Sequence, residues 1–354
     1  MANKIIDLFC GCGGLSYGFE MAGFEVSLAI DMWNDAIKTY NHNHKNKVAR
    51  CEDIHNLTKE FLDEFTKENK ITGIVGGPPC QGFSTVGKRD VNDPRNHLYT
   101  EYCRIVETIK PDFFVLENVK GLLTLSGGAF RDDIHVRFES LGYTVTHKLL
   151  NAADFGIPQN RQRVFFIGMK DKKFIFPKEH ETILTCSDAL SDMPDINEEN
   201  GMSDFMQYTK EPCNEYQRYL RNGSVGIKNN QITIHSEQTK RIIGMIKDGG
   251  KIKDLPPEYW DIRKYNKAFE RMSSTRPSNT VDTGHRNYFH YSENRIPTAR
   301  ENARLQSFPD SFEFLGTKGS QYKQIGNAVP PLLAKAIAVE IMKQLGERCK
   351  KNEN

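Results

Sequence analysis

The chain has 354 residues, of which 38% are hydrophobic and 27% are charged, and its formal net charge is +2 at pH 7. This length accommodates one large domain or two smaller ones, each with its own core. A net charge so near zero does not by itself indicate a nucleic-acid-binding protein, so any such surface depends on where the 48 basic residues lie.

The eight cysteines are scattered along the chain and form no Cys-x-x-Cys pair. This spacing argues against a disulfide framework and against a thiolate zinc site. The N-terminal residues lack the pattern of a signal peptide, and no apolar run approaches 18 residues. We therefore expect a cytoplasmic protein that has no metal and no membrane association.

Short apolar runs alternate with helical patterns over the first 170 residues. Expected helices cover 15–22 and 35–43, and the expected strands cover 5–9, 25–30, 73–75, 112–116, 143–150 and 163–169. This alternation predicts an α/β fold with a doubly wound, Rossmann-like sheet. Ligands of such sheets bind at the carboxyl ends of the strands, where the polar motifs of this chain fall.

The pattern changes after about residue 180 and returns near the C-terminus. We expect a catalytic domain formed by 1–180 and 304–345, with a second, smaller domain over 181–303. One amphipathic helix is expected over 324–345, packed on the first domain, and a frayed tail over 346–354.

The segment Asp7–Gly14, DLFCGCGG, follows the first expected strand. Its glycines allow a tight turn and a close approach of a ligand to the backbone. Asp31 ends the second strand, where a carboxylate can accept hydrogen bonds from ribose hydroxyls. The spacing GxGG differs from the GxGxxG of dinucleotide-binding enzymes, and a glycine turn alone is a weak signal.

Cys80 lies in the segment Gly76–Ser84, GGPPCQGFS, directly after an expected strand. An isolated cysteine is usually a small buried hydrophobic residue. The two prolines before Cys80 fix the backbone, and a core thiol needs no such scaffold. A thiolate nucleophile is therefore the favoured interpretation.

Charged residues follow at neighbouring strand ends. Glu117, in the segment ENV, ends the strand at 112–116, and Arg161 and Arg163, in QNRQR, precede the strand at 163–169. A pocket with one thiol, one carboxylate and one guanidinium suits a planar substrate ring that forms hydrogen bonds.

Six segments in this order resemble the cytosine-5 DNA methyltransferases of bacterial restriction-modification systems. They cover nearly the whole chain outside a variable region: DLFCGCGG, GGPPCQGFS, ENV, QNRQR, RPSNTVDT at 276–283 and QIGNAVPP at 324–331. The resemblance implies an S-adenosylmethionine-dependent methyltransferase with a target-recognition domain. Its product would be S-adenosylhomocysteine, and no metal would be required.

The resemblance also implies roles for the catalytic residues. Cys80 would add to C6 of a cytosine flipped out of the duplex, which makes C5 nucleophilic. Glu117 would hydrogen-bond N3 and the exocyclic amine, and Arg163 would bind O2 with Arg161 in support.

The same resemblance assigns cofactor and DNA contacts. Met32 stands where some family members carry an aromatic residue. The implied cofactor-binding residues are Phe9, Gly11, Cys12, Gly13, Gly14, Asp31, Met32, Asp53, Ile54, Pro78, Leu98, Asn327, Ala328 and Val329. The polar segment 81–97 resembles a loop that closes over DNA, and its expected DNA contacts are Gln81, Ser84, Lys88, Arg89 and Arg95.

Recognition of the target sequence is expected between about 185 and 275, where the family is variable, so the resemblance does not supply the target. Residues 286–290 and 300–304 are expected to contact the DNA backbone. The candidate base-contacting residues are Arg218, Arg221, Lys228, Asn229, Asn230, Gln231, Thr233, His235, Lys240 and Arg241.

The expected partner is double-stranded DNA, bound by a monomer in the cytoplasm in association with the nucleoid. A cognate restriction endonuclease would act on the same site without a stable complex. Three alternatives stay open: a tRNA cytosine-5 methyltransferase of the same fold, a catalytically silent DNA-binding relative, and a nicotinamide-dependent oxidoreductase. The Pro-Pro-Cys motif and the GxGG spacing disfavour the last of these.

Overall fold

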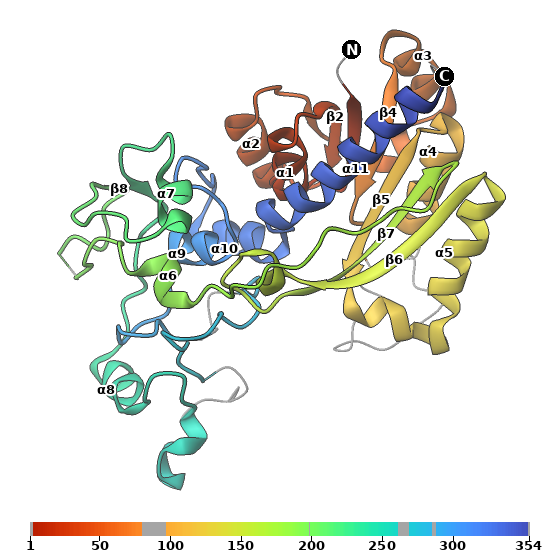
Figure 1. The fold of residues 1–354 in the computed structure, drawn as a ribbon. Coiled ribbons are helices and arrows are strands. Elements are labelled where there is room, and N and C mark those ends of the chain that lie inside the picture. Colours follow the sequence, from red (N-terminus) through yellow and green to blue (C-terminus); the bar gives the residue numbers. More distant parts are fainter. Residues whose placement is uncertain (1–2, 80–96, 198, 261–268, 285–287, 353–354) are drawn as a thin grey trace. The chain divides into compact units, whose positions relative to one another are not determined.

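The structure is a computed structural model, and every structural statement below concerns the residues that it describes (Figure 1). Of His97 and residues 347–352 only the backbone is described. The described residues are 3–79, 97–197, 199–260, 269–284 and 288–352.

The chain forms two compact units. Unit 1 comprises Met1–Asn151, Gln162–Glu179 and Leu333–Asn354, and unit 2 comprises Ala152–Arg161 and His180–Leu332. The sequence-based boundaries differ from this division, because 152–161 and 304–332 pack within unit 2 instead of the catalytic domain.

Unit 1 is built on a seven-stranded sheet in the order β3-β2-β1-β4-β5-β7-β6. Strands β1 to β5 are parallel, whereas β7 runs antiparallel to both β5 and β6. The strands are β1 Lys4–Leu8, β2 Glu25–Asp31, β3 Ala49–Cys51, β4 Ile71–Gly76, β5 Phe113–Val119, β6 Tyr143–Asn151 and β7 Gln162–Lys170.

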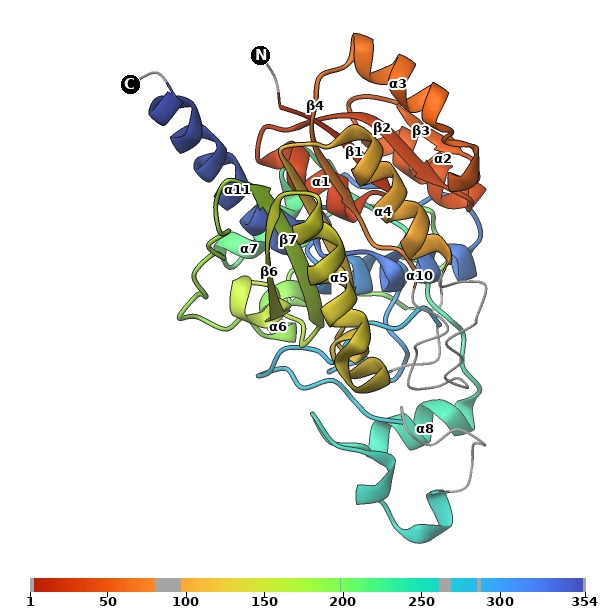
Figure 2. The same ribbon diagram turned by 90° about the vertical axis from the view of Figure 1, so that its right-hand side faces the viewer.

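Helices cover both faces of this sheet (Figures 1 and 2). Side chains of α3, α4 and α5 share one core with Leu8, Phe114 and Phe166 of the strands. On the opposite face Phe19 of α1 stacks on Phe113, at 6.3 Å between ring centroids. The helices of this unit are α1 Gly14–Met21, α2 Asn34–Asn43, α3 Lys59–Glu68, α4 His97–Ile109, α5 Ala129–Ser140 and most of α11, Pro331–Asn352. The doubly wound α/β prediction is confirmed.

Two local features differ from the expectation. Strand β3 was missed, since ARC is short and polar. The helix expected at 324–345 is two helices, α10 Lys318–Asn327 and α11, because the consecutive Pro330 and Pro331 interrupt the helical hydrogen bonds. The backbone is helical as far as Asn352, and fraying of the tail from 346 stays a prediction.

In unit 1 the expected packing of α11 on the catalytic core is present. The Gln344 side chain exchanges hydrogen bonds with the backbone of Ile175, at 3.1 and 2.9 Å. By length and composition alone, Lys318–Gly346 could cross a membrane, but 56% of its most apolar window is buried inside the protein. The core helix of a globular domain passes the same test, so this is weak evidence for a membrane span.

Unit 2 consists of short elements and long loops. An apolar cluster that includes Ile243, Ile246, Phe269 and Phe289 forms one of its cores. Its elements are α6 Cys186–Leu190, α7 Glu215–Arg221, α8 Glu237–Met245, α9 Ala299–Leu305, α10 and a hairpin of β8 Phe205–Met206 and β9 Ile227–Lys228.

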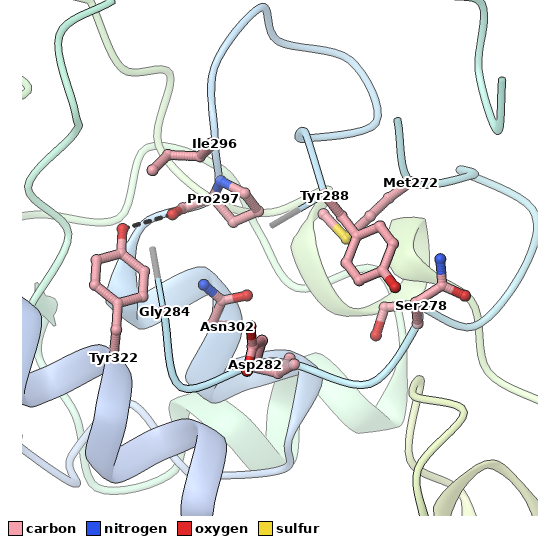
Figure 3. A pocket seen from close by; sticks show the side chains of 11 residues that line it. Met272, Ser278, Asp282, Gly284, Tyr288, Ile296, Pro297, Asn302 and Tyr322 are labelled. Carbon is pink, nitrogen blue, oxygen red and sulfur yellow. Dashed lines mark hydrogen bonds between the residues drawn. The ribbon is translucent and has the colours of Figure 1, made fainter. Parts of the chain in front are cut away.

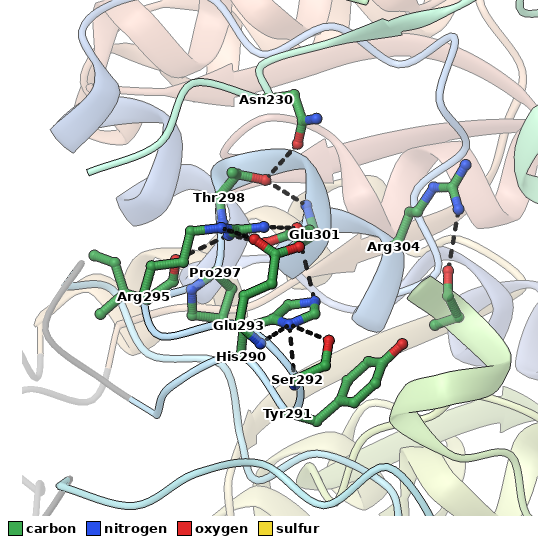
Figure 4. A network of polar contacts seen from close by, with 12 residues as sticks. Asn230, His290, Tyr291, Ser292, Glu293, Arg295, Pro297, Thr298, Glu301 and Arg304 are labelled. Carbon is green, nitrogen blue, oxygen red and sulfur yellow. Dashed lines mark hydrogen bonds and ion pairs between the residues drawn. The ribbon is translucent and has the colours of Figure 1, made fainter. Parts of the chain in front are cut away.

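Buried ion pairs hold α9 in unit 2 (Figure 4). Thr298 caps the helix, and Glu301 accepts hydrogen bonds from Arg295 at 2.6 and 2.7 Å. Arg304 is fully buried and pairs with Asp192 at 2.5 Å and Asp310 at 2.6 Å.

Arg300 is also fully buried in unit 2, and it donates to the carbonyl groups of Pro309 and Phe312. The expectation that residues 300–304 contact the DNA backbone was therefore wrong for both arginines, since their cations are enclosed in the protein. Arg286 and Asn287 lie outside the described residues.

Candidate active site

The carboxyl ends of the five parallel strands lie at one edge of the sheet, and the antiparallel β7 begins at the same edge. The register pairs Val119 at the end of β5 with Arg163 at the start of β7. Side chains two residues apart on a strand share a face, so Glu117 and Arg163 are diagonal neighbours. Arg163 Nε lies 3.0 Å from Glu117 Oε1, and the two side chains are only 15% and 12% exposed.

The segment that follows β4 lies against this ion pair. A Cβ atom added to Gly77 would lie 2.8 Å from Glu117 Oε2, so glycine allows the close approach of this backbone to the carboxylate. Asn118 Nδ2 donates to the carbonyl oxygen of Pro78 at 2.9 Å. The ENV and GGPPC motifs are thus joined directly within unit 1.

Cys80 follows Pro79 in the chain and lies outside the described residues. The expected DNA contacts of the loop that follows lie outside them as well: Gln81, Ser84, Lys88, Arg89 and Arg95. The structure therefore brings together Glu117, Arg163 and the residues that lead to Cys80.

Arg161 has a different environment from Arg163. It belongs to unit 2, is fully buried, and donates to the carbonyl oxygens of Gly326 at 2.8 Å and Ala328 at 2.9 Å, with a longer contact of 3.4 Å to Val281. One guanidinium thus connects the QNRQR, RPSNTVDT and QIGNAVPP segments. These contacts fit a residue that fixes the backbone of its neighbours.

The turn after β1 has the unusual backbone that its glycines predict. Gly11 and Gly13 have φ values of 55° and 93°, and Phe9 also has a positive φ of 61°. A Cβ atom on Gly13 would lie 2.1 Å from His44 Nε2, whereas the space around Gly11 is open. Asp31 fixes this turn by accepting the amide hydrogen of Gly11, at 2.9 Å.

The remaining cofactor candidates of unit 1 are at the ends of β2, β3 and β4. Met32 is 67% exposed directly after Asp31, and Ile54 is buried. The Asp53 carboxylate accepts the His55 amide hydrogen at 3.0 Å and pairs with the imidazole at 2.6 Å. These hydrogen bonds, with that from the backbone first, lower the pKa of Asp53 and keep it ionised.

This donor set fits S-adenosylmethionine. The backbone at Gly11 is open to a ligand, as the amino acid end of the cofactor requires. An adenosyl group needs hydrogen-bond acceptors and apolar surface, which are offered by the carboxylates of Asp31 and Asp53 and by the exposed Met32. Cys12 is buried and Leu98 packs against the core of unit 1. Asn327, Ala328 and Val329 lie in unit 2, at the end of α10.

Asp7 is buried beneath the turn. Its Oδ2 accepts the Ser16 hydroxyl at 2.6 Å, Ser16 accepts the Tyr40 hydroxyl at 2.9 Å, and Asp7 Oδ1 has no partner. Burial, the largest cause, raises the pKa of Asp7 from 3.8 to about 7. An acid whose pKa rises on folding stabilises the protein at low pH and loses that contribution as the pH climbs through the folded-state pKa.

Asp7→Asn should therefore flatten the pH dependence of stability. We expect the variant to gain stability relative to the native chain between about pH 4 and pH 7, by about 4 kcal/mol for a shift of about three pKa units. Urea unfolding at several pH values measures this difference, with Asp63→Asn on α3 as an exposed control. Parallel profiles for the native chain and Asp7→Asn would contradict the assignment.

Four of the ten base-contact candidates of the recognition region make the following contacts within unit 2. Asn230 is buried and accepts a hydrogen bond from the Thr298 hydroxyl, and Asn229 Oδ1 accepts the amide hydrogen of Phe314. Arg221 lies over the Tyr208 ring at 3.7 Å, and His235 accepts the Ile296 amide hydrogen. Asn230 is enclosed in the protein and its amide already bonds Thr298, whereas base contacts by Arg221, Asn229 and His235 stay a prediction. Arg241 of α8 is exposed.

Sequence reasoning missed a pocket in unit 2 (Figure 3). It encloses about 340 Å³ including its open mouth, and its lining combines apolar walls with Ser278, Asn279, Asp282 and Asn302. The Ser278 hydroxyl is buried and has no partner. The RPSNTVDT segment was the available signal, because three of these residues belong to it.

Among the residues that the structure describes, no group of three His, Cys, Asp or Glu side chains is placed to hold a metal ion. A doubly wound sheet with a glycine turn after β1 and polar groups at the strand ends defines the class of Rossmann-like enzymes.

A model of the C-5 cytosine-specific DNA methylases matches residues 3–343. The Type II methyltransferase M1.HphI of Haemophilus parahaemolyticus is 40% identical and covers 97% of this chain and 87% of its own. M.DdeI of Desulfomicrobium norvegicum is 39% identical, with coverages of 96% and 88%.

Solved structures agree. A DNA modification methyltransferase encoded within an E. coli prophage has 30% identity and a TM-score of 0.83, covering 98% of this chain and 100% of its own. The S. pombe Dnmt2 methyltransferase, with 19% identity and a TM-score of 0.61 over 97% and 99% of the two chains, shares the fold.

The chain belongs to the C-5 cytosine-specific DNA methylase family. It is a DNA (cytosine-5) methyltransferase of the Type II restriction-modification kind, and the resemblance stated from the motifs is confirmed. Methyltransferases of this family use S-adenosylmethionine and act on DNA.

Proposed function

We propose that the enzyme methylates C5 of a cytosine flipped out of duplex DNA through a covalent bond between Cys80 and C6 of the base. The observation that carries this proposal is the partly buried Glu117–Arg163 pair, held against the segment that leads to Cys80. Such a pair presents a hydrogen-bond acceptor and a donor to the edge of a planar base.

In the proposed reaction the Cys80 thiolate forms a bond to C6, and the electron pair of the C5–C6 double bond becomes available at C5. S-adenosylmethionine, when bound at the strand ends of unit 1, would supply an electrophilic methyl group to C5, with S-adenosylhomocysteine as the leaving group. Loss of the C5 proton to solvent base and departure of the Cys80 thiolate then restore the aromatic ring.

The two charged residues would act on the same ring. The Glu117 carboxylate would accept hydrogen bonds from N3–H and the exocyclic amine and so favour protonation of N3. This proton, taken from solvent and returned when the ring is restored, neutralises the negative charge that the thiolate brings. A guanidinium carries five N–H donors, so Arg163 can hold both Glu117 and O2 of the base. Arg161 fixes backbone segments of unit 2, and its supporting role is proposed from the resemblance.

The cofactor would bind at the strand ends of unit 1. Asp31 would accept ribose hydroxyls, the backbone of the glycine turn would receive the methionine end, and Phe9, Met32 and Ile54 would contact adenine. The other residues proposed at this site are Cys12, Asp53, Pro78 and Leu98. Asn327, Ala328 and Val329 of unit 2 are proposed as cofactor contacts from the resemblance of their motif alone.

Three further properties are proposed because the relatives named above are Type II methyltransferases. The enzyme acts as a monomer in the cytoplasm, in association with the nucleoid. A cognate restriction endonuclease cleaves the same sequence when it is unmethylated, without forming a stable complex with this chain.

Incubation with labelled S-adenosylmethionine and duplex DNA tests the proposed substrate. We expect label in DNA as 5-methylcytosine and none in tRNA, and bisulfite sequencing of the product identifies the target sequence. Label in tRNA but not in DNA would establish the alternative substrate, and no label in either nucleic acid would support a silent DNA-binding relative.

A further inference from the structure

A buried imidazole, that of His44, packs beneath the glycine turn of unit 1. His44 is the residue that ends α2, and its side chain is completely buried. A Cβ atom built on Gly13 would lie 2.1 Å from His44 Nε2 and 2.8 Å from Cε1. The ring therefore fills the space on this side of the turn, and the backbone of Gly13 packs directly on it.

The two sides of the turn differ. Gly11 faces open space, and its amide hydrogen is accepted by Asp31 at 2.9 Å. Gly13 has a φ of 93° and precedes the first residue of α1, and a Cβ atom here would meet both His44 and Tyr40. The open side is accessible to a ligand, whereas the closed side rests on the rings of Tyr40 and His44.

His44 is held by three residues. Its Nδ1 lies 2.8 Å from Oε2 of Glu20, in the last turn of α1. Its ring stacks on that of Tyr40, with 3.7 Å between centroids, and packs nearly at right angles to the ring of Tyr17, with 5.8 Å between centroids. A bond at one end and rings on two sides leave the imidazole one position.

Tyr40 extends the same support. It is four residues before His44, so both rings lie on one face of the helix, toward α1. The Tyr40 hydroxyl donates to Ser16 at 2.9 Å, and the Ser16 hydroxyl donates to Asp7 at 2.6 Å. The end of α2 therefore fixes both α1 and the glycine turn from which α1 begins.

We propose that His44 is a positioning residue for S-adenosylmethionine, an inference that rests on the proposed cofactor site at this turn. The imidazole, held by Glu20, fixes the backbone at Gly13 so that the open side at Gly11 is ready for the amino acid end of the cofactor. A turn that already has its binding conformation loses less conformational entropy when the ligand binds. The support therefore acts on affinity for the cofactor and not on methyl transfer.

Calorimetric titration of the full chain with S-adenosylhomocysteine tests this role without requiring methyl transfer. His44→Ala removes the ring, and we expect the dissociation constant to rise by about tenfold or more. In steady-state assays KM for S-adenosylmethionine should rise with it, while kcat stays within about threefold of the native value. His42→Ala, which removes an exposed histidine of the same helix, is the matched control and should bind as the native chain does.

Substitutions of Glu20 test the role without opening a cavity beneath the turn. Glu20→Gln keeps a hydrogen-bonding group beside the imidazole and should retain nearly native affinity for S-adenosylhomocysteine. Glu20→Ala releases the ring and should weaken binding by about threefold to tenfold. Urea unfolding of each variant measures stability separately, so that affinities are compared between folded proteins.

The outcomes separate this inference from the proposed function. Native affinity in Glu20→Ala and in folded His44→Ala would overturn the positioning role and leave the cofactor site in place. A lower kcat with an unchanged dissociation constant would overturn it as well. A native chain that does not bind S-adenosylhomocysteine would contradict the proposed cofactor site itself, and the role of His44 with it.

Discussion

Glu117→Gln is expected to lower the rate of methyl transfer by about 10²- to 10⁴-fold while binding of S-adenosylmethionine and DNA changes little. Glutamine keeps the shape of the side chain, so the Asn118–Pro78 hydrogen bond and the strand pairing of β5 should persist. It loses the negative charge that would stabilise a protonated cytosine ring and that pairs with Arg163 at 3.0 Å. Single-turnover assays with excess enzyme isolate this chemical step from product release.

Two variants sharpen the test. Glu64→Gln removes an exposed carboxylate of α3 in the same unit and should retain the native rate. Arg163→Gln should be nearly as slow as Glu117→Gln. If both side chains act on one base, the double variant should lose much less than the product of the two single losses. A Glu117→Gln rate within about threefold of the native rate would remove Glu117 from the chemistry.

Arg304→Met is expected to destabilise the protein by about 3–5 kcal/mol, the largest effect on stability that we predict. Arg304 is fully buried and donates to Asp192, to Asp310 and to the Ala189 carbonyl oxygen. Methionine fills similar space but leaves the buried Asp310 carboxylate without the Arg304 cation, and it leaves Asp192 with the longer contact to Arg221 at 3.3 Å. Desolvation of such uncompensated charges costs more than loss of the pair itself.

Urea unfolding monitored by circular dichroism measures the effect. Arg218→Met is the matched control, because Arg218 pairs with Glu215 at 2.7 Å with side chains that are 50% and 88% exposed. The control should leave the free energy of unfolding close to that of the native chain, because both of its charges are solvated. Equal effects of the two substitutions would show that burial does not determine how much the Arg304 ion pairs contribute to the free energy of unfolding.

The sequence predicts the sheet and the clustering of motifs well, because both follow from local signals. Short apolar runs before Gly11, Gly77 and Glu117 mark strand ends, and parallel strands bring such ends to one edge. The direction of β7 could not be predicted, because the apolar pattern of 163–169 is compatible with both a parallel and an antiparallel strand. Yet this antiparallel strand is what places Arg163 beside Glu117.

The arginines show where sequence reasoning stops. Arg300 and Arg304 are cations in a polar stretch, so they were expected to contact the DNA backbone. In the structure Arg304 instead pairs with Asp192, which is far away in the sequence, and with Asp310. Arg161 and Arg163 differ by two positions, yet one lies in unit 2 against carbonyl groups and the other in unit 1 against Glu117. Burial and pairing depend on tertiary contacts, which residue type and spacing do not reveal.

The most direct test of the account is covalent trapping with 5-fluorocytosine. A duplex that carries this base at the target position blocks removal of the C5 substituent after methyl transfer, so the Cys80–C6 bond should persist. With S-adenosylmethionine present, we predict a denaturation-resistant complex of enzyme and DNA whose peptide map places the attachment at Cys80, and no complex with Cys80→Ser. An active enzyme that forms no such complex, or one attached at another residue, would contradict the proposed mechanism.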